Sequence, residues 1–280
     1  MKFSVLSALP LLHAGFAETV TMAKASWRYA LAFAFALAAG LSLQSAVDLG
    51  GWLGPIVLLS PGMIVFCLWS YQCFQAGGLA KAGAMPRTGS LKLACAYGLF
   101  CMALFLIVFM LALFLIIFAV VLVIGSGYDP SQGDANDVTG SVEALRESGA
   151  IYLLYTMLFL AIAGFARVLV RLTAFAPATV DNHQIMIFQT WRWTKHKILD
   201  FLPAMLALQL LPIVVIFYLA GEIGRCGERA IPASMSGVSQ VEVVLTHFAV
   251  SAVQVSLWLP AVLLGHGLAT AIYKRVAPVK

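Results

Sequence analysis

Uninterrupted apolar runs constrain this chain more than any other feature of its sequence. Several of them exceed the roughly 20 residues that an α-helix needs to cross a hydrocarbon core of about 30 Å. Only 10% of the residues are charged and 62% are hydrophobic, and the mean hydropathy is +0.96, whereas soluble domains carry about 25% charged residues. The runs are continuous rather than alternating, which excludes a transmembrane β-barrel. The sequence therefore predicts an all-α, polytopic helical membrane bundle.

Six membrane spans are predicted, in a single integral membrane domain over residues 1–280. A small-residue pattern at Ala32, Ala36 and Gly40 predicts close helix contact in the first span. The third span is so long that it must tilt, kink or project beyond the bilayer. The approximate bounds of the six are 27–47, 56–77, 93–124, 150–170, 202–219 and 243–269.

Two amphipathic helices are predicted to lie flat in the membrane interface, one before the first span and one before the fifth. The first covers about 3–22, with Leu9, Leu12 and Phe16 on one face and a bend at Pro10.

The second interfacial helix covers about 181–198 and follows a hinge at Pro177. Asp181, with Gln184 three residues later, has the form of a capping box that would start it. Ile187, Phe188, Trp191, Ile198 and Leu202 are predicted to share its apolar face.

Lysine and arginine are distributed unequally between the two sides of the predicted membrane. Fourteen of the 17 lie on one side, and Arg146, Arg225 and Arg229 lie on the other, whereas nine of the 12 acidic residues lie opposite the basic majority. Because basic loops stay in the cytoplasm, both termini are predicted to be cytoplasmic. Contact with lipid head groups accounts for the net charge of +5, so no nucleic-acid partner is predicted.

Basic residues near the hinge form the first candidate site. Arg167 and Arg171 lie four residues apart, hence on one helical face, either as phosphate-binding forks or as ordinary topology anchors. Arg192, Lys195 and Lys197 follow in the next segment and are predicted to contact anionic lipid.

A polar face on the sixth span forms the second candidate site. His247, Ser251, Gln254 and Trp258 share one side of the helix, and His266 is rotated away from them. Polar groups inside a membrane either line a pathway or join helices by hydrogen bonds. Both interpretations stay open at this point.

Motifs for other chemistry are missing from the sequence. It contains no catalytic constellation, metal-ligand spacing or cofactor motif, so no catalytic residue, metal or cofactor is predicted. The acidic stretch 128–149 lacks EF-hand spacing and is predicted to be a solvated loop. Cys67, Cys73, Cys95 and Cys101 are predicted to pack as small hydrophobic residues, and Cys226 has no obvious partner.

Two motifs carry a resemblance to a known group of proteins. They are Arg171-Leu-Thr-Ala-Phe-Ala-Pro-Ala-Thr-Val-Asp181 and Phe188-Gln-Thr-Trp-Arg-Trp-Thr-Lys-His-Lys197. The chain resembles six-helix bacterial inner-membrane proteins that are similar to the membrane domain fused to some glycerophosphoryl diester phosphodiesterases. The resemblance implies a six-helix bundle in that membrane. The phosphodiesterase activity belongs to a separate soluble barrel that this sequence lacks, so it is not carried over.

Two functions remain as alternatives, with a membrane-embedded enzyme as a weaker third. The first is a non-enzymatic membrane protein that organises anionic lipid or partner proteins. The second is a permease, or a membrane subunit of a transporter that works with other membrane subunits or a cytoplasmic ATPase. In the second case the polar face of the sixth span would line the path.

Overall fold

The residues that the computed structural model describes are 8–46, 53–79, 86–127, 138–195, 197–230 and 240–278, and almost all of them are helical, with short turns between the helices. Within these ranges six helices are long and apolar enough to cross a membrane, so the chain is a multi-pass membrane protein of the predicted all-α class. It divides into a larger unit, Met1–Tyr97 with Val170–Lys280, and a smaller unit, Gly98–Leu169.

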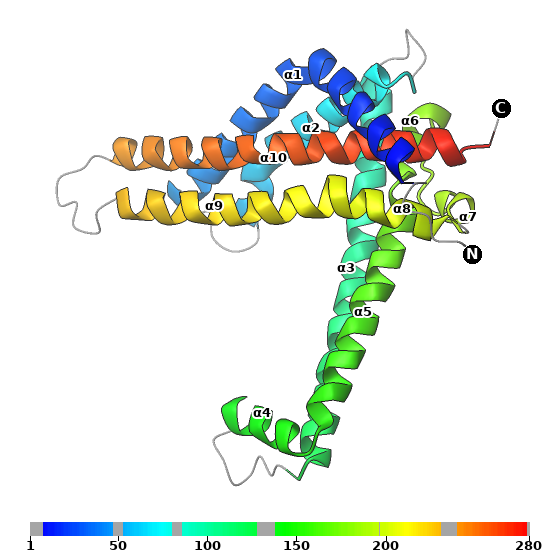
Figure 1. Cartoon of the computed structure of the whole chain (residues 1–280). Helices are drawn as coiled ribbons and strands as arrows, with labels where there is room; N and C mark the ends of the chain where they lie inside the picture. Colours follow the sequence, from blue (N-terminus) through cyan, green and yellow to red (C-terminus); the bar gives the residue numbers. More distant parts are fainter. Residues whose placement is uncertain are drawn as a thin grey trace. The chain divides into compact units, whose positions relative to one another are not determined.

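The larger unit is built around its first helix. α1 runs antiparallel to both α2 and α10, and α9 packs against α10 (Figure 1). The helices of this unit are α1 (Leu9–Ala46), α2 (Leu53–Ala76), the start of α3 (Pro86–Gly125), the end of α5 (Ala150–Leu172), α6 (Phe175–Asn182), α7 (Thr190–Trp193), α8 (Ile198–Met205), α9 (Leu211–Ala230) and α10 (Gln240–Val276), with a π-helix over Leu206–Leu210.

The predicted interfacial helix over 3–22 is not a separate element, because Leu9–Ala46 forms one helix of 38 residues. Pro10 lies in its first turn, where a missing N–H costs nothing, so no bend arises there. Residues 3–7 lie outside the described ranges. The predicted apolar face, including Leu9 and Phe16, is exposed, and small or polar residues such as Gly15 and Thr19 are buried instead.

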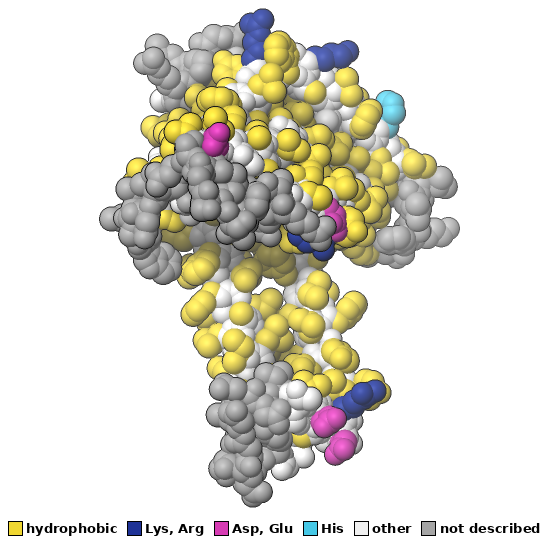
Figure 2. Space-filling view, turned by 90° about the vertical axis from the view of Figure 1, so that its left-hand side faces the viewer, with side chains coloured by type: hydrophobic (Ala, Val, Ile, Leu, Met, Phe, Trp, Pro, Cys, Tyr) yellow, Lys and Arg dark blue, Asp and Glu magenta, His cyan; other side chains and the backbone are white. Residues whose placement is uncertain are grey.

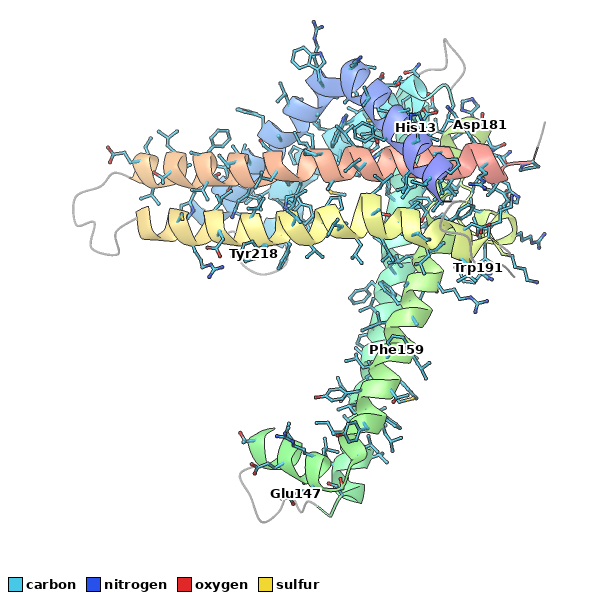
Figure 3. The ribbon with its side chains drawn as sticks, viewed as in Figure 1. His13, Glu147, Phe159, Asp181, Trp191 and Tyr218 are labelled. Atoms are coloured by element: carbon cyan, nitrogen blue, oxygen red, sulfur yellow. The ribbon has the colours of Figure 1, made fainter. Side chains whose placement is uncertain are left out.

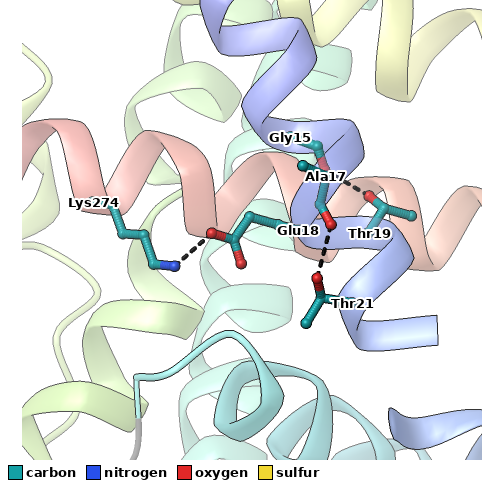
Figure 4. Close-up of polar contacts among 6 residues, drawn as sticks. All are labelled: Gly15, Ala17, Glu18, Thr19, Thr21 and Lys274. Atoms are coloured by element: carbon teal, nitrogen blue, oxygen red, sulfur yellow. Dashed lines mark hydrogen bonds and ion pairs between the residues drawn. The ribbon is translucent and has the colours of Figure 1, made fainter. Parts of the chain in front are cut away.

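Side-chain hydroxyls in the first half of α1 bond to the backbone of the preceding turn. Thr19 donates to Gly15 O at 2.8 Å and Thr21 to Ala17 O at 3.1 Å (Figure 4). Ser26 lies further along and donates to the carbonyl oxygen four residues before it at 2.7 Å. Such bonds bend helices, and the ribbon of α1 changes direction within its length in Figure 1.

Close packing of α1 against α2 occurs at Gly40, one of the three residues predicted to make it. Ala38 is fully enclosed and Ala34 is buried, whereas Ala32 is exposed. Gly40 does lie in the contact, since a Cβ atom there would overlap the carbonyl oxygen of Leu58. Both faces of this helix are apolar, so the sequence pattern does not distinguish the one that faces α2.

The predicted helix over 181–198 is wrong, because α6, a turn and α7 occupy this region. The break in the chain falls at Thr173 and Ala174, and Pro177 lies in the first turn of α6 rather than at a hinge. Asp181 lies in the last turn of α6, so it starts no helix. The predicted apolar face is also split, since Ile187 is buried and Phe188 is 74% exposed.

The fifth span is longer than predicted and contains a widened turn. α8, the π-helix and α9 continue without a break from Ile198 to Ala230, past the predicted end of the span at 219. The π-helix ends at Leu210, two residues before Pro212. In a regular α-helix the ring of Pro212 would press against the carbonyl of Leu208, and a local π-turn relieves that clash.

The smaller unit holds most of α3 and α5, together with α4 (Val138–Glu147). The apolar side chains of these parts of α3 and α5 are largely exposed, and hydrophobic side chains cover most of the described surface in Figure 2. α4 corrects the prediction of a loop over 128–149; residues 128–137 lie outside the described ranges.

The four cysteines that were predicted to pack as small hydrophobic residues differ in their exposure. Cys67 and Cys73 are buried, as predicted, but Cys95 and Cys101 are exposed on α3, and all five cysteines are free.

Candidate functional site: a buried arginine in the α5–α8 connection

The α5–α8 connection, defined here as residues 171–197, is folded by its own hydrogen bonds. Thr179 is buried, donates to Phe175 O at 2.8 Å and accepts from the Met186 N–H at 3.2 Å, which turns the chain back on α6. His183 ends α6 in the left-handed region at φ 54°. Its carbonyl oxygen accepts a hydrogen bond from Lys92 Nζ at 2.9 Å. These contacts hold the connection against the start of α3.

A second set of hydrogen bonds attaches the connection to α10. The Tyr273 hydroxyl donates to Asp181 Oδ2 and accepts from Asn182 Nδ2 at 3.2 Å. Figure 3 shows Asp181 and Trp191 on this connection, near the carboxyl-terminal end of α10. The acidic side chain of the connection is therefore already hydrogen-bonded.

Arg171 is the distinctive residue of the connection. Its side chain comes from the last turn of α5, and the residue is only 6% exposed. The guanidinium carbon lies 4.4 Å from the ring centre of Trp191, and Nε is enclosed without a hydrogen-bond partner. A cation–π contact contributes about 0.5–2 kcal/mol, whereas a buried, uncompensated charge costs several kcal/mol. The described residues thus leave this cation without sufficient compensation.

The other predicted basic residues lie in different surroundings. Arg167 is exposed on the part of α5 that belongs to the smaller unit. Arg192 and Lys195 are exposed and Lys197 is half-buried, all within the connection. Two exposed cations, one half-buried cation and the buried Arg171 therefore share a single short segment.

The predicted polar face on the sixth span lies on α10. His247, Ser251 and Trp258 are half-buried there. Gln254 is half-buried as well, and its Nε2 donates to Ala220 O on α9 at 3.0 Å, so this amide joins two helices by a hydrogen bond. A role for this face as a path stays a prediction.

Sequence reasoning missed the environment of His266, which is buried between α2 and α10. Nδ1 lies 2.6 Å from Val262 O and Nε2 lies 2.9 Å from Ser70 Oγ, and the ring stacks on Phe74 at 4.9 Å between centres. A carbonyl only accepts, so Nδ1 carries the proton and Ser70 donates to Nε2. The polar and aromatic run 69–74 inside the second span was the available signal.

The chain matches no protein-family model, no curated protein and no solved structure at a significant level. The resemblance to six-helix bacterial inner-membrane proteins therefore stays a prediction. Among the described residues, no group of three or more His, Cys, Asp or Glu side chains could hold a metal ion. The chemistry that the connection offers is the binding of anions by guanidinium and ammonium groups.

Proposed function

We propose that this protein is a non-enzymatic, multi-pass protein of a bacterial inner membrane that gathers anionic phospholipid around its α5–α8 connection, on the cytoplasmic side. The observation that carries the proposal is the cationic character of this segment. Arg192 and Lys195 are exposed there, and Arg171 is buried with no ion pair among the described residues. The acid of the segment, Asp181, accepts a hydrogen bond from Tyr273.

Electrostatic attraction to anionic head groups is strong enough to matter. A basic side chain near the cytoplasmic leaflet contributes about 1 kcal/mol. Arg192, Lys195 and Lys197 together thus contribute about 3 kcal/mol, roughly a hundredfold local enrichment of anionic lipid. Trp191 and Trp193 flank Arg192, and such aromatic rings favour the level of the head groups.

Lipid selectivity in bilayers tests the proposal. The protein is reconstituted in phosphatidylcholine containing spin-labelled phosphatidylglycerol or spin-labelled phosphatidylcholine, and the motionally restricted fraction is measured by electron paramagnetic resonance. Wild type should prefer phosphatidylglycerol, and the preference should fall as salt rises. The triple variant Arg192→Gln, Lys195→Gln, Lys197→Gln should lose most of it.

The matched control removes three positive charges from the predicted opposite side, by Arg146→Gln, Arg225→Gln and Arg229→Gln. This variant should keep the preference. Equal association of both labelled lipids with wild type would contradict the proposal. Labelling of a tag after Lys280 from the periplasmic side alone would contradict the cytoplasmic placement.

A further inference from the structure

Arg171 differs from the exposed cations of the connection because its side chain is buried. The neighbours on either side, Val170 and Leu172, are buried and apolar. The ion pairs between described residues join Arg225 to Glu222 and Lys274 to Glu18, so neither compensates Arg171. A buried guanidinium is costly unless an anion pairs with it, and the described part of the chain supplies no such anion.

The side chain leaves only its outer edge open to such an anion. The ring of Trp191 covers one face of the guanidinium. Nε is fully enclosed and has no hydrogen-bond partner. The two terminal nitrogens also make no hydrogen bond to a described residue, but they are not enclosed. The residual exposure of Arg171 therefore includes these two nitrogens. Two parallel N–H donors in one plane match two oxygens of a phosphate group.

Building on the proposed function, we infer that Arg171 and Trp191 form a discrete site for one phosphate group, distinct from the diffuse attraction of the exposed cations. Arg171 holds two phosphate oxygens through its terminal nitrogens. The ring of Trp191 packs against one face of the planar guanidinium and excludes water from that face. The phosphate belongs to a phospholipid head group or to a free phosphate ion, and both present the same oxygens. Because the site is desolvated, salt screens it far less than it screens Arg192 or Lys195.

Counting bound lipid by native mass spectrometry tests the inference. The purified chain is titrated with phosphatidylglycerol or phosphatidylcholine in a neutral detergent at low and high salt, and separately with inorganic phosphate while tryptophan fluorescence is followed. We expect one phosphatidylglycerol per chain that persists at high salt. Arg171→Gln should weaken this site about tenfold or more. Arg171→Lys keeps the charge but loses the two parallel N–H donors, so it should weaken the site partly.

Arg167→Gln is the matched control, since it removes one exposed arginine from the same helix and should leave the persistent lipid in place. If Arg171→Gln fails to fold, Trp191→Leu serves instead, because it keeps the charge and removes the covering ring. Saturable binding of inorganic phosphate that disappears in these variants would assign the site to free phosphate. Persistent lipid that is unchanged in both variants, or no binding of either probe by wild type, would overturn the inference.

Failure of this site and failure of the proposed function are distinguishable. The triple variant of Arg192, Lys195 and Lys197 should abolish the salt-sensitive lipid preference and keep the persistent lipid. Arg171→Gln should lose the persistent lipid and keep the salt-sensitive lipid preference.

Discussion

Nε2 of His266 on α10 lies 2.9 Å from the hydroxyl oxygen of Ser70 on α2, and this bond joins two helices deep in the larger unit. Ser70→Ala would leave the ring nitrogen buried without a donor. We expect a loss of about 1–3 kcal/mol in stability, measured by thermal unfolding in detergent. The double variant Ser70→Ala, His266→Phe removes both polar groups and should lose less. Equal stability of Ser70→Ala and wild type would contradict the assigned bond.

Gly267 on α10 lies where the helix crosses α1. A Cβ atom there would overlap Thr19 Oγ1 and the carbonyl oxygen of Gly15. Gly267→Ala should therefore separate the two helices and cost about 1–3 kcal/mol. Gly221→Ala on α9 is the control, because nothing lies within 4 Å of its Cβ position. That control should be neutral or gain about 0.5–1 kcal/mol, and thermal unfolding of both variants measures the contrast.

Glu18 on α1 and Lys274 on α10 form an ion pair between the first and last described helices (Figure 4). The side chain of Lys274 is 45% exposed, so the pair is a weak one. Lys274→Glu should destabilise the protein by about 0.2–1 kcal/mol, and the swap Glu18→Lys, Lys274→Glu should recover most of it. A double-mutant cycle in unfolding by detergent titration measures the coupling. Additive single effects would show that the two charges do not interact.

Gln254 separates the two interpretations of the polar face on α10. Its amide donates to Ala220 O, so Gln254→Leu should cost about 0.6 kcal/mol if joining helices is its whole role. Changing His247 and Gln254 together to Leu should then leave any transport-dependent growth unaffected. Loss of such growth at unchanged stability would favour the permease interpretation.

Hydropathy predicted the number of helices that are long and apolar enough to cross a bilayer. The six apolar helices follow from run length alone, and the start of α5 at Ala150 agrees with its predicted start. Arg171 was also selected from sequence as a candidate for anion contact, but its burial was not foreseen. The ring of Trp191 that covers it lies 20 residues away along a connection that was expected to be a regular helix.

The packing of the helices against one another could not be predicted from the sequence. In lipid a helix carries no apolar-to-polar contrast that marks its buried face, so Ala32 was chosen where Ala34 and Ala38 are buried. Thr179 closes the turn after α6 through the Met186 N–H, a tertiary contact with no local signature. His266 was left out of the predicted polar face because it is rotated away from it, and its partner, Ser70, lies 196 residues earlier in the chain.

The pairing of α1 with α10 has a consequence for biosynthesis. Thr19 reaches Leu263 O, 244 residues later, so the buried face of the first helix enters the bilayer long before its partner is translated. Until α10 arrives, Gly15 and Thr19 present small and polar groups to lipid. A chain whose synthesis stops before α10 would therefore leave this face of α1 in contact with lipid instead of with its partner helix.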